Sequence, residues 1–448
     1  MVGDGSSGRA KSRSASRWRL TQGWVFPTLC VALIFGAHIA YGAIRIEAAL
    51  AATALTGALL TLSLVAPVLR QDLARVRGLL WPALLFAIVL AAGALSLTPY
   101  APGGPHPTWA YLGLERGSAS IDPSATILEL VKLLGLASIF LLGAIAGASD
   151  DRARATINWF LIVAGLYALW AFFGFTTGTV FQTQSRRLEG SLMSPNTAGT
   201  FFGVVLIIAL GAFLSTLRGG QSGRRLNSTT AYGVGVMAFS ACLLLTASRG
   251  AALGVALAVA ALFLLLFFSD RINWSRASLI AFTALLVGFL GVAVFGERLI
   301  ERWANWDADA ASRQTMFAIH WRAFLDAPLS GYGLGTFDII HRISMTAETL
   351  PAMWTVRATH NVYIQWLEEA GLVGALPMFA CIAVIIGVAL VRGFRRSRMT
   401  YLLFALIAAN VVTLVHGYTD FALQTPSFAL MWSFLLGLQF ALSQGSGR

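Results

Sequence analysis

The chain has 448 residues, of which 57% are apolar and only 12% are charged, and its formal net charge is +12. Soluble globular domains average about 25% charged residues, so this composition excludes a soluble enzyme, a disordered chain and a disulfide-rich secreted scaffold. Apolar runs fill the whole length, which also excludes a protein anchored by one span. The basic residues lie between these runs instead of forming one patch. Membrane orientation therefore explains the charge better than nucleic-acid binding does.

Twelve stretches are apolar enough to cross a bilayer core about 30 Å thick, which needs about 20 apolar residues per helix. In chain order, we expect transmembrane helices over 24–44, 47–69, 79–98, 125–147, 156–176, 197–217, 230–247, 251–269, 277–295, 371–391, 400–416 and 426–443. The expected fold class is an all-α integral membrane protein. The first run follows a basic, polar segment as in a signal peptide, but no small-residue cleavage site is evident, so we expect a retained first helix.

The basic residues indicate the orientation of these helices. With the N-terminus in the cytoplasm, the inside segments hold 20 of the 32 Lys and Arg residues and the outside segments hold 11, which is the positive-inside pattern. Lys132 is intramembrane and lies three residues after Glu129, so the two can pair on one helical face. The expected parts are a cytoplasmic basic tail over 1–23, helices one to nine over 24–295, a large outer loop over 296–370, helices ten to twelve over 371–443 and a cytoplasmic tail over 444–448. In the large loop, apolar spacing predicts amphipathic helices over 313–325 and 360–370.

Three of the eleven outer arginines, which run against the orientation rule, have suggestive positions. Arg187 precedes the sixth span, Arg249 lies in the short turn between the seventh and eighth spans, and Arg313 opens the first helix of the large loop. A guanidinium group is always charged and its planar fork of donors fits phosphate. These arginines therefore favour a site for a lipid-linked phosphate or pyrophosphate. Snorkelling to lipid head groups, or pairing with loop carboxylates, is the alternative.

Among the six histidines, His360 has the most suggestive position, because it lies where the large loop meets the tenth span. A neutral imidazole there can accept a proton near physiological pH. His320 and His341 are weaker rivals in the same loop, and His416 and Asp420 lie at an outer turn that would line the same cavity. The histidines lack the spacing of a zinc site and none adjoins a cysteine. The three cysteines each lie in an apolar run, as buried free thiols do.

Two short strings resemble known motifs weakly. Gly331-Tyr-Gly-Leu-Gly335 resembles a nucleotide-binding loop, but no βαβ unit surrounds it. Turn glycines, with backbone amides near a phosphate, are the better interpretation. Asp307-Ala-Asp309 has the DxD form that holds a divalent metal in many sugar transferases. A three-residue match arises often by chance, so no metal is expected.

The motifs together resemble the family of O-antigen ligases and O-antigen polymerases, which are bacterial envelope glycosyltransferases. The resemblance rests on an ordered series of strings between about 185 and 375. They are Arg187-Leu-Glu-Gly190 with Pro195-Asn196, Ser248-Arg249-Gly250, Ser312-Arg313, Pro328 to Phe337, His360-Asn361 and Glu369-Ala-Gly371-Leu-Val-Gly374. Each string is loose alone, whereas the ordered set is fairly specific.

The resemblance implies a GT-C-like, metal-independent, inverting glycosyltransferase of the bacterial inner membrane that needs no cofactor. Its donor would be a glycan on undecaprenyl pyrophosphate, used at the periplasmic face. The acceptor would be a sugar hydroxyl of the lipid A core in a ligase, or another lipid-linked repeat unit in a polymerase. Membrane lipids would surround it, and no nucleic acid would bind.

The resemblance also assigns roles to residues. His360 would be the catalytic base, and Arg187, Arg249 and Arg313 would hold the pyrophosphate. Arg186 competes with Arg187 for this role, although the RxxG spacing favours Arg187. Four further residues are expected to line the substrate cavity: Asn196, Asn361, Gly333 and His416.

Three alternatives remain open beside the favoured ligase. The polymerase is close, and only the twelve spans and the single late outer loop favour the ligase over it. A transporter of an anionic lipid or solute would need charged residues deep in several spans, and only Glu129 and Lys132 qualify. A structural scaffold would need neither the outward arginines nor His360.

Overall fold

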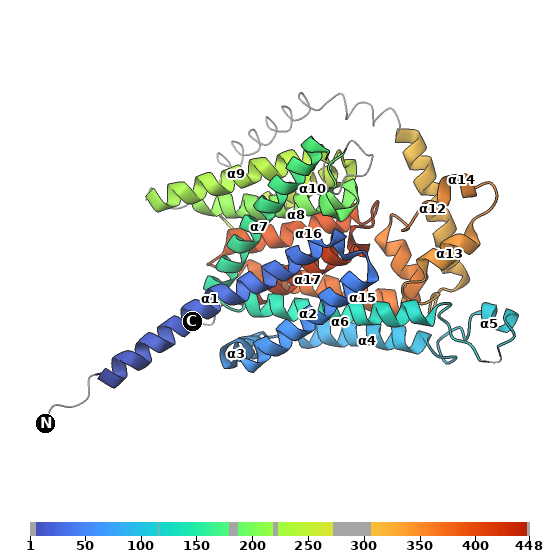
Figure 1. Cartoon of the computed structure of the whole chain (residues 1–448), viewed down its shortest axis with the longest axis horizontal. Helices are drawn as coiled ribbons and strands as arrows, with labels where there is room; N and C mark the ends of the chain where they lie inside the picture. The colour runs from blue at the N-terminus through green and yellow to red at the C-terminus, as the bar shows by residue number, and fades with distance from the viewer. Residues whose placement is uncertain (1–5, 115, 179–186, 218–222, 272–305, 446–448) are drawn as a thin grey trace.

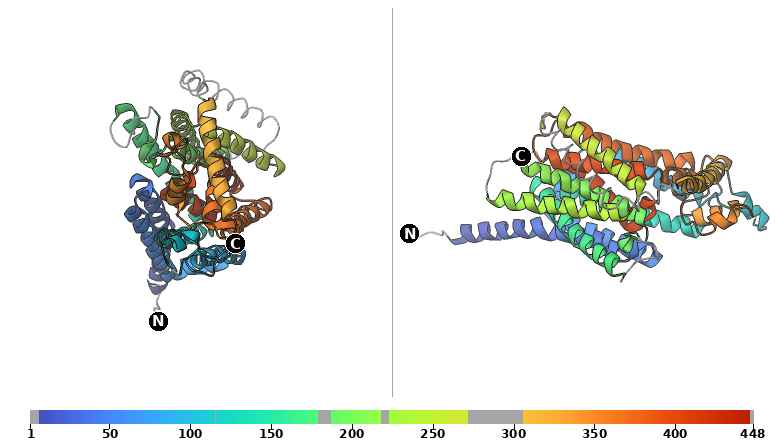
Figure 2. Two further views of the ribbon diagram at one scale, coloured as in Figure 1. Left: turned by 90° about the vertical axis from the view of Figure 1, so that its right-hand side faces the viewer. Right: turned by 90° about the horizontal axis from the view of Figure 1, so that it is seen from above.

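The structure is a bundle of long helices with smaller helices gathered at one end. The computed structural model describes residues 6–114, 116–178, 187–217, 223–271 and 306–445, and all regular secondary structure in them is helical. The long helices run side by side, and α5 and α12–α14 lie together at one end, at the right of Figure 1, as a second direction of view confirms (Figure 2). The α-helices are α1 (Ser6–Ile39), α2 (Ile46–Val65), α3 (Pro67–Arg75), α4 (Leu80–Ser96), α5 (Pro107–Tyr111), α6 (Pro123–Gly147), α7 (Asp150–Thr177), α8 (Pro195–Leu217), α9 (Gly223–Leu245), α10 (Arg249–Phe268), α12 (Trp306–Asp326), α13 (Phe337–Ser344), α14 (Leu350–Met353), α15 (Val362–Gly393), α16 (Thr400–His416) and α17 (Pro426–Leu442). Three short 3-10 turns complete the described elements: η1 (Tyr41–Ala43), η2 (Gly190–Leu192) and η3 (Ala422–Gln424).

Most of these helices suit a membrane. In the described part of the chain, seven are long and apolar enough to cross one, and α3 and α4 together form an eighth, bent candidate. The shorter apolar helices are Gly23–Ile39, within α1, and the whole of α16 and α17. The expected all-α architecture with several membrane-span candidates is confirmed. The count of twelve stays a prediction, and the ninth expected span, 277–295, lies outside the described residues.

The second expected span ends earlier than predicted. The sequence favours one helix over 47–69, but α2 stops at Val65 and α3 starts at Pro67, with Ala66 extended between them (φ −75°, ψ 115°). A proline disfavours helical geometry in the residue before it, and its own ring suits the first turn of a new helix. After α3, the chain turns by 95° into α4.

The closest pairing in the bundle joins α6 to α17 through glycines. An added Cβ on Gly143 would collide with the carbonyl oxygen of Phe434, and one on Gly437 would collide with the carbonyl oxygen of Phe140. Small residues let two membrane helices approach to backbone contact, where van der Waals packing replaces the hydrophobic effect as the driving force. These glycines therefore fix the centre of the bundle.

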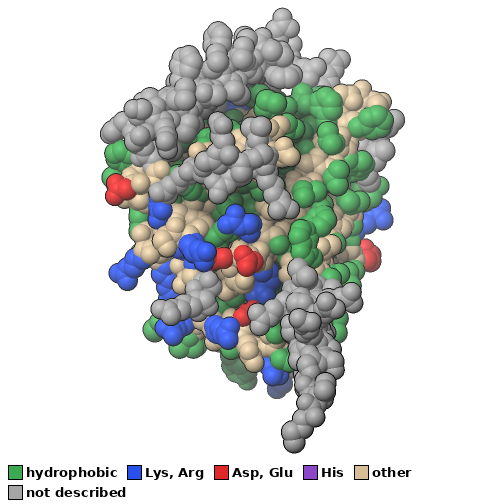
Figure 3. Space-filling view, turned by 90° about the vertical axis from the view of Figure 1, so that its left-hand side faces the viewer, with side chains coloured by type: hydrophobic (Ala, Val, Ile, Leu, Met, Phe, Trp, Pro, Cys, Tyr) green, Lys and Arg blue, Asp and Glu red, His purple; other side chains and the backbone are tan. Residues whose placement is uncertain are grey.

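The end of the bundle opposite the small helices is basic. Figure 3 looks onto this end and shows Lys and Arg side chains gathered on it. Ion pairs tie its segments together, because Arg152 at the start of α7 contacts Asp72 of α3 at 2.7 Å and Arg396 contacts Asp150. The segments that the sequence assigned to the inside thus meet at one end, as the alternating topology requires.

Candidate functional site

His416, the last residue of α16, is the centre of the candidate site. It is 2% exposed, and Arg187, Arg313, His360 and Asp420 all lie close enough to interact with it electrostatically. These residues are up to 233 positions apart in the sequence. The fold therefore gathers the predicted base and two of the predicted arginines around one buried ring, at the end of the bundle that carries the small helices.

His360 sits in a constrained backbone position beside this ring. Its φ of 53° lies in the left-handed region, which non-glycine residues seldom adopt and which costs about 1–3 kcal/mol. The chain is held there because the Val362 amide donates to the carbonyl of Gly417 at 2.9 Å. The imidazole packs edge-on against Phe421, with ring centroids 4.7 Å apart, and stays 27% exposed. Strain held in place next to an accessible imidazole is typical of a functional position.

Asp420 completes a histidine–carboxylate pair. Its side chain is fully buried, and Oδ1 lies 3.6 Å from Nδ1 of His360. Burial acts to raise the pKa of Asp420, but the nearby imidazoles of His360 and His416 outweigh it, so the pKa lies below its ordinary value of 3.8. An ionised carboxylate at Nδ1 favours the tautomer with its proton there, which leaves Nε2 of His360 as the base.

His416 itself serves as a brace between helices. Its Nδ1 lies 2.7 Å from the Thr200 hydroxyl of α8, and its Nε2 lies 3.4 Å from the Ser248 hydroxyl before α10. Gly250 permits this approach, because an added Cβ would lie only 2.5 Å from the imidazole. His416, expected to line the cavity, therefore has both ring nitrogens engaged with protein. The sequence gave no signal for Thr200, and Ser248 entered only as part of the string Ser248-Arg249-Gly250.

Arg187 is oriented by neutral oxygens. Its Nε donates to the carbonyl of Thr246 at 2.7 Å, and an Nη donates to Oδ1 of Asn196 at 2.8 Å. Asn196, expected as a cavity residue, thus positions the arginine. These two oxygens fix the orientation of the guanidinium group.

Arg249 opens α10 beside this arrangement. Ser248 caps the helix by accepting the amide of Ala251, and the partial positive charge of a helix N-terminus favours anions. Ser248 and Gly250, on either side of Arg249 in the chain, both lie against the His416 imidazole, so this helix end belongs to the same site.

The glycine loop does not present its amides to a ligand. The amides of Tyr332 and Gly333 donate to the carbonyls of Glu368 and Glu369, at 3.1 and 2.9 Å. The interpretation of this loop as a phosphate cradle is therefore wrong, because α15 uses its donors. Gly333 is needed for space and backbone geometry instead, since its φ is 98° and an added Cβ would collide with Ser120.

The partner of this loop is a break in α15. Gly371 has a φ of 57° and interrupts the helix, which frees the amides of Leu372 and Val373 to bind the carbonyls of Pro328 and Leu329. The backbone hydrogen bonds that the helix break leaves open are thus made with the glycine loop and the residues before it, and those of the loop are made with α15. The helix expected over 360–370 is the part of α15 before this break, and the span expected from residue 371 is the part after it.

Asn361 also has a structural role in place of the expected cavity role. Its side chain is 2% exposed and accepts hydrogen bonds from the amides of Tyr363 and Ile364, so it caps α15. The cap fixes the start of the helix directly after His360. His320 and His341, the weaker candidates, lie in a different buried cluster with Glu368.

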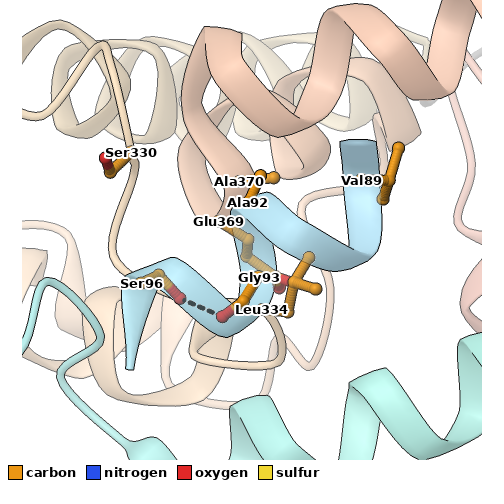
Figure 4. A pocket seen from close by; sticks show the side chains of 8 residues that line it. All are labelled: Val89, Ala92, Gly93, Ser96, Ser330, Leu334, Glu369 and Ala370. Carbon is orange, nitrogen blue, oxygen red and sulfur yellow. Dashed lines mark hydrogen bonds between the residues drawn. The ribbon is translucent and has the colours of Figure 1, made fainter. Parts of the chain in front are cut away.

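A small pocket nearby contains none of the residues around His416 (Figure 4). It lies between α4, the glycine loop and α15, and its lining residues are Val89, Ala92, Gly93, Ser96, Ser330, Leu334, Glu369 and Ala370. The Glu369 carboxylate accepts from the Gly335 amide at 2.7 Å and from Gln365 at 3.0 Å. The Glu369 carboxylate in this pocket therefore holds the glycine loop and α15 together.

The remaining expected positions are Arg186, Asp307 and Asp309. Arg186 lies outside the described residues, and the side chains of Asp307 and Asp309 lie outside them too. In the ranges whose side chains are described, no group of three His, Cys, Asp or Glu residues could hold a metal ion.

Residues 234–379 match the family model described as O-antigen ligase. The matched stretch includes Arg249, Arg313 and His360, whereas Arg187, His416 and Asp420 lie outside it and join the site through the fold. No curated protein matches the chain. Over this stretch the family match supports the resemblance expected from the motifs, and together with the apolar helices it indicates a multi-pass membrane protein.

Proposed function

We propose, starting from the O-antigen ligase family domain that the chain carries at residues 234–379, that the protein is an O-antigen ligase. It transfers a glycan from undecaprenyl pyrophosphate to a sugar hydroxyl of the lipid A core. The reaction takes place at the periplasmic face of the bacterial inner membrane. The observation that carries this proposal is the convergence of Arg187, Arg313, His360 and Asp420 around His416.

His360 acts as the general base. Asp420 holds the proton on Nδ1 and stabilises the imidazolium that forms, so Nε2 removes the proton of the acceptor hydroxyl as the oxygen attacks the anomeric carbon. The separation of 3.6 Å between His360 and Asp420 is long for a hydrogen bond, and such pairs often tighten only when substrate binds. Asp420 is a positioning residue for the base.

The arginines hold the leaving group. Arg187, Arg249 and Arg313 bind the pyrophosphate and stabilise the charge that gathers on it as the glycosidic bond breaks. The N-terminus of α10 adds its dipole beside Arg249. Pyrophosphate is a good leaving group, so this mechanism requires neither a general acid nor a metal ion. One displacement with one base inverts the anomeric carbon.

The polymerase is the second candidate, because it would use the same donor and the same chemistry. The two differ in the acceptor, which is a lipid A core for the ligase and a second lipid-linked repeat unit for the polymerase. A transporter is less well supported, because the membrane-embedded charges Glu129 and Lys132 pair with each other.

The test is a transfer assay with purified protein in liposomes. Lipid-linked glycan is supplied with lipid A core, with a second lipid-linked repeat unit, or with neither. The ligase proposal predicts that transfer product forms only in the assay to which lipid A core is added as acceptor. Longer lipid-linked glycan would favour the polymerase instead, and movement of the donor across the bilayer with no new glycosidic bond would favour the transporter.

A further inference from the structure

A buried hydrogen-bond network of two histidines and a glutamate connects α12, α13, α14 and α15. It is separate from the residues proposed to react. It consists of Glu368 on α15, His320 on α12, His341 on α13 and the carbonyl of Met353 on α14. Oε2 of Glu368 lies 2.6 Å from Nδ1 of His320, Nε2 of His320 lies 3.0 Å from Nδ1 of His341, and Nε2 of His341 lies 2.9 Å from the Met353 carbonyl. The side chains of Glu368 and His320 are fully buried.

The carbonyl at one end sets the direction of every hydrogen bond. A carbonyl only accepts, so Nε2 of His341 carries a proton, and its Nδ1 accepts when the ring is neutral. His320 must then donate from Nε2, which leaves its own Nδ1 as an acceptor. Glu368 can satisfy that nitrogen only by donating, so with neutral rings the carboxyl holds the proton.

Burial supports neutral rings. It lowers the pKa of His320 to about 4, and it lowers the pKa of His341 as well. For His341, the Met353 carbonyl and Asp338 oppose this change, while His320 and Arg357 add to it. Burial also raises the pKa of Glu368 to about 9, which favours the protonated carboxyl.

Stacked rings enclose the network. Phe337 stacks on His320 with ring centroids 4.9 Å apart and on His341 at 5.2 Å. The two imidazoles lie edge to edge in nearly one plane, with ring centroids 5.2 Å apart and an interplanar angle of 15°. This arrangement excludes water from the hydrogen bonds, and hydrogen bonds are stronger in such a dry interior than in water.

The network joins the two helices that present the reacting groups. His320 follows Arg313 by seven residues, which is two turns along the same face of α12. Glu368 follows His360 by eight residues, in the first part of α15. The hydrogen bond between Glu368 and His320 thus fixes one helix against the other, a short distance behind the site.

We propose that the Glu368–His320–His341 network, with its proton on Glu368, positions Arg313 relative to His360. The effect on transfer rests on the proposed function, whereas the location of the proton does not. These three residues act through Arg313 and touch no substrate. Breaking the network moves Arg313 away from the pyrophosphate and weakens donor binding, while the base and its carboxylate stay in place.

The first test replaces Glu368 by two residues of similar size. Glu368→Gln keeps a donor, because the side-chain amide can donate to Nδ1 of His320, and its KM for lipid-linked donor should stay within about twofold of wild type. Glu368→Met removes the donor and should raise that KM about tenfold, the usual scale for one lost buried hydrogen bond, with kcat little changed. In an Arg313→Ala background, Glu368→Met should add nothing. A Gln variant as impaired as Met, or a Met effect that adds fully to Arg313→Ala, overturns the proposal.

The second test needs no transfer activity. An infrared difference spectrum between wild type and Glu368→Gln in liposomes should show the carbonyl stretch of a protonated carboxyl in the wild type alone. Carboxylate bands in its place would overturn the proton assignment, even if Glu368→Met failed to fold. A wild-type protein that shows the protonated carboxyl but transfers no glycan would contradict the proposed function and leave the network's proton where we assign it.

Discussion

Two imidazole–carboxylate pairs lie at the same end of this molecule and differ in every property that matters for catalysis. His320 and Glu368 are fully buried and 2.6 Å apart, and their neighbours occupy the remaining nitrogen of the ring. His360 is 27% exposed, lies 3.6 Å from Asp420 and occupies a left-handed backbone position. The first pair is closed, whereas the second keeps one nitrogen accessible. Exposure and backbone strain, more than the distance to a carboxylate, are therefore the reasons to propose His360 and not His320 as the base.

The largest effect should come from the accessible pair. His360→Ala should lower kcat by about 10²–10⁴, the usual contribution of a general base, while binding of undecaprenyl pyrophosphate stays near wild type. Single-turnover transfer and a separate binding titration measure the two quantities. His106→Ala is the matched control, since His106 is a loop histidine that caps α5. Full activity of His360→Ala would remove it as the base.

The next largest effect concerns the geometry of the guanidinium groups. Arg249→Lys should lose about 10²–10³ in kcat, nearly as much as Arg249→Ala, because lysine keeps the charge but not the planar fork of donors. Arg342→Ala is the control, since Arg342 is exposed and lies 3.7 Å from Asp338 on α13. An active Lys variant would show that charge alone suffices.

Asp420→Asn should lower kcat about 10²-fold with little change in KM, because the amide no longer selects the productive tautomer of His360.

The same residue should affect stability in acid. The pKa of Asp420 lies below 3.8, so its carboxylate stabilises the fold fully above about pH 4. That contribution disappears as the pH falls through the lowered value. The unfolding temperature of the wild type should therefore fall by this contribution only in acid. The unfolding temperature of Asp420→Asn should not show this additional fall. A kcat of Asp420→Asn equal to wild type would contradict the pairing.

A smaller effect should follow from crowding His416. Gly250→Ala places a Cβ against the imidazole and should lower transfer about tenfold by displacing the start of α10 by a fraction of an ångström. Gly165→Ala on α7 has nothing within 4 Å and should be neutral in the same assay. Equal activity of the two variants would show that the contact between α10 and His416 has no role in transfer.

Chelation should have no effect at all. The proposed mechanism uses arginines where other sugar transferases use a divalent ion, so transfer after treatment with a chelator and dialysis should equal that of untreated protein. If activity were lost and added Mg²⁺ or Mn²⁺ restored it, this would contradict the metal-independent mechanism and support metal binding by Asp307 and Asp309.

The sequence predicted most of the bundle, because apolar length and the position of arginines follow directly from the physics of the bilayer. It also identified Arg187, Arg313, His360, His416 and Asp420 as outer residues, and the structure gathers these around one point. The early end of α2 follows from Pro67, which the hydropathy of the run concealed.

The contacts that position these residues could not be predicted. Thr200 and Ser248 contact His416 across 216 and 168 positions. Thr200 is an isolated hydroxyl in an apolar helix, and the string Ser248-Arg249-Gly250 indicates no partner for Ser248. The same holds for His320 and Glu368, which are 48 positions apart on different helices. The glycine loop misled for a related reason, since its partner is the break at Gly371, which only the folded chain reveals.

The configuration of the new glycosidic bond tests the mechanism most directly. Proton NMR of the product reports whether the anomeric carbon that left the pyrophosphate has inverted. A single displacement, with His360 as base and arginines on the leaving group, predicts complete inversion. Retention would require a covalent intermediate on an enzyme nucleophile and would contradict the account of this site.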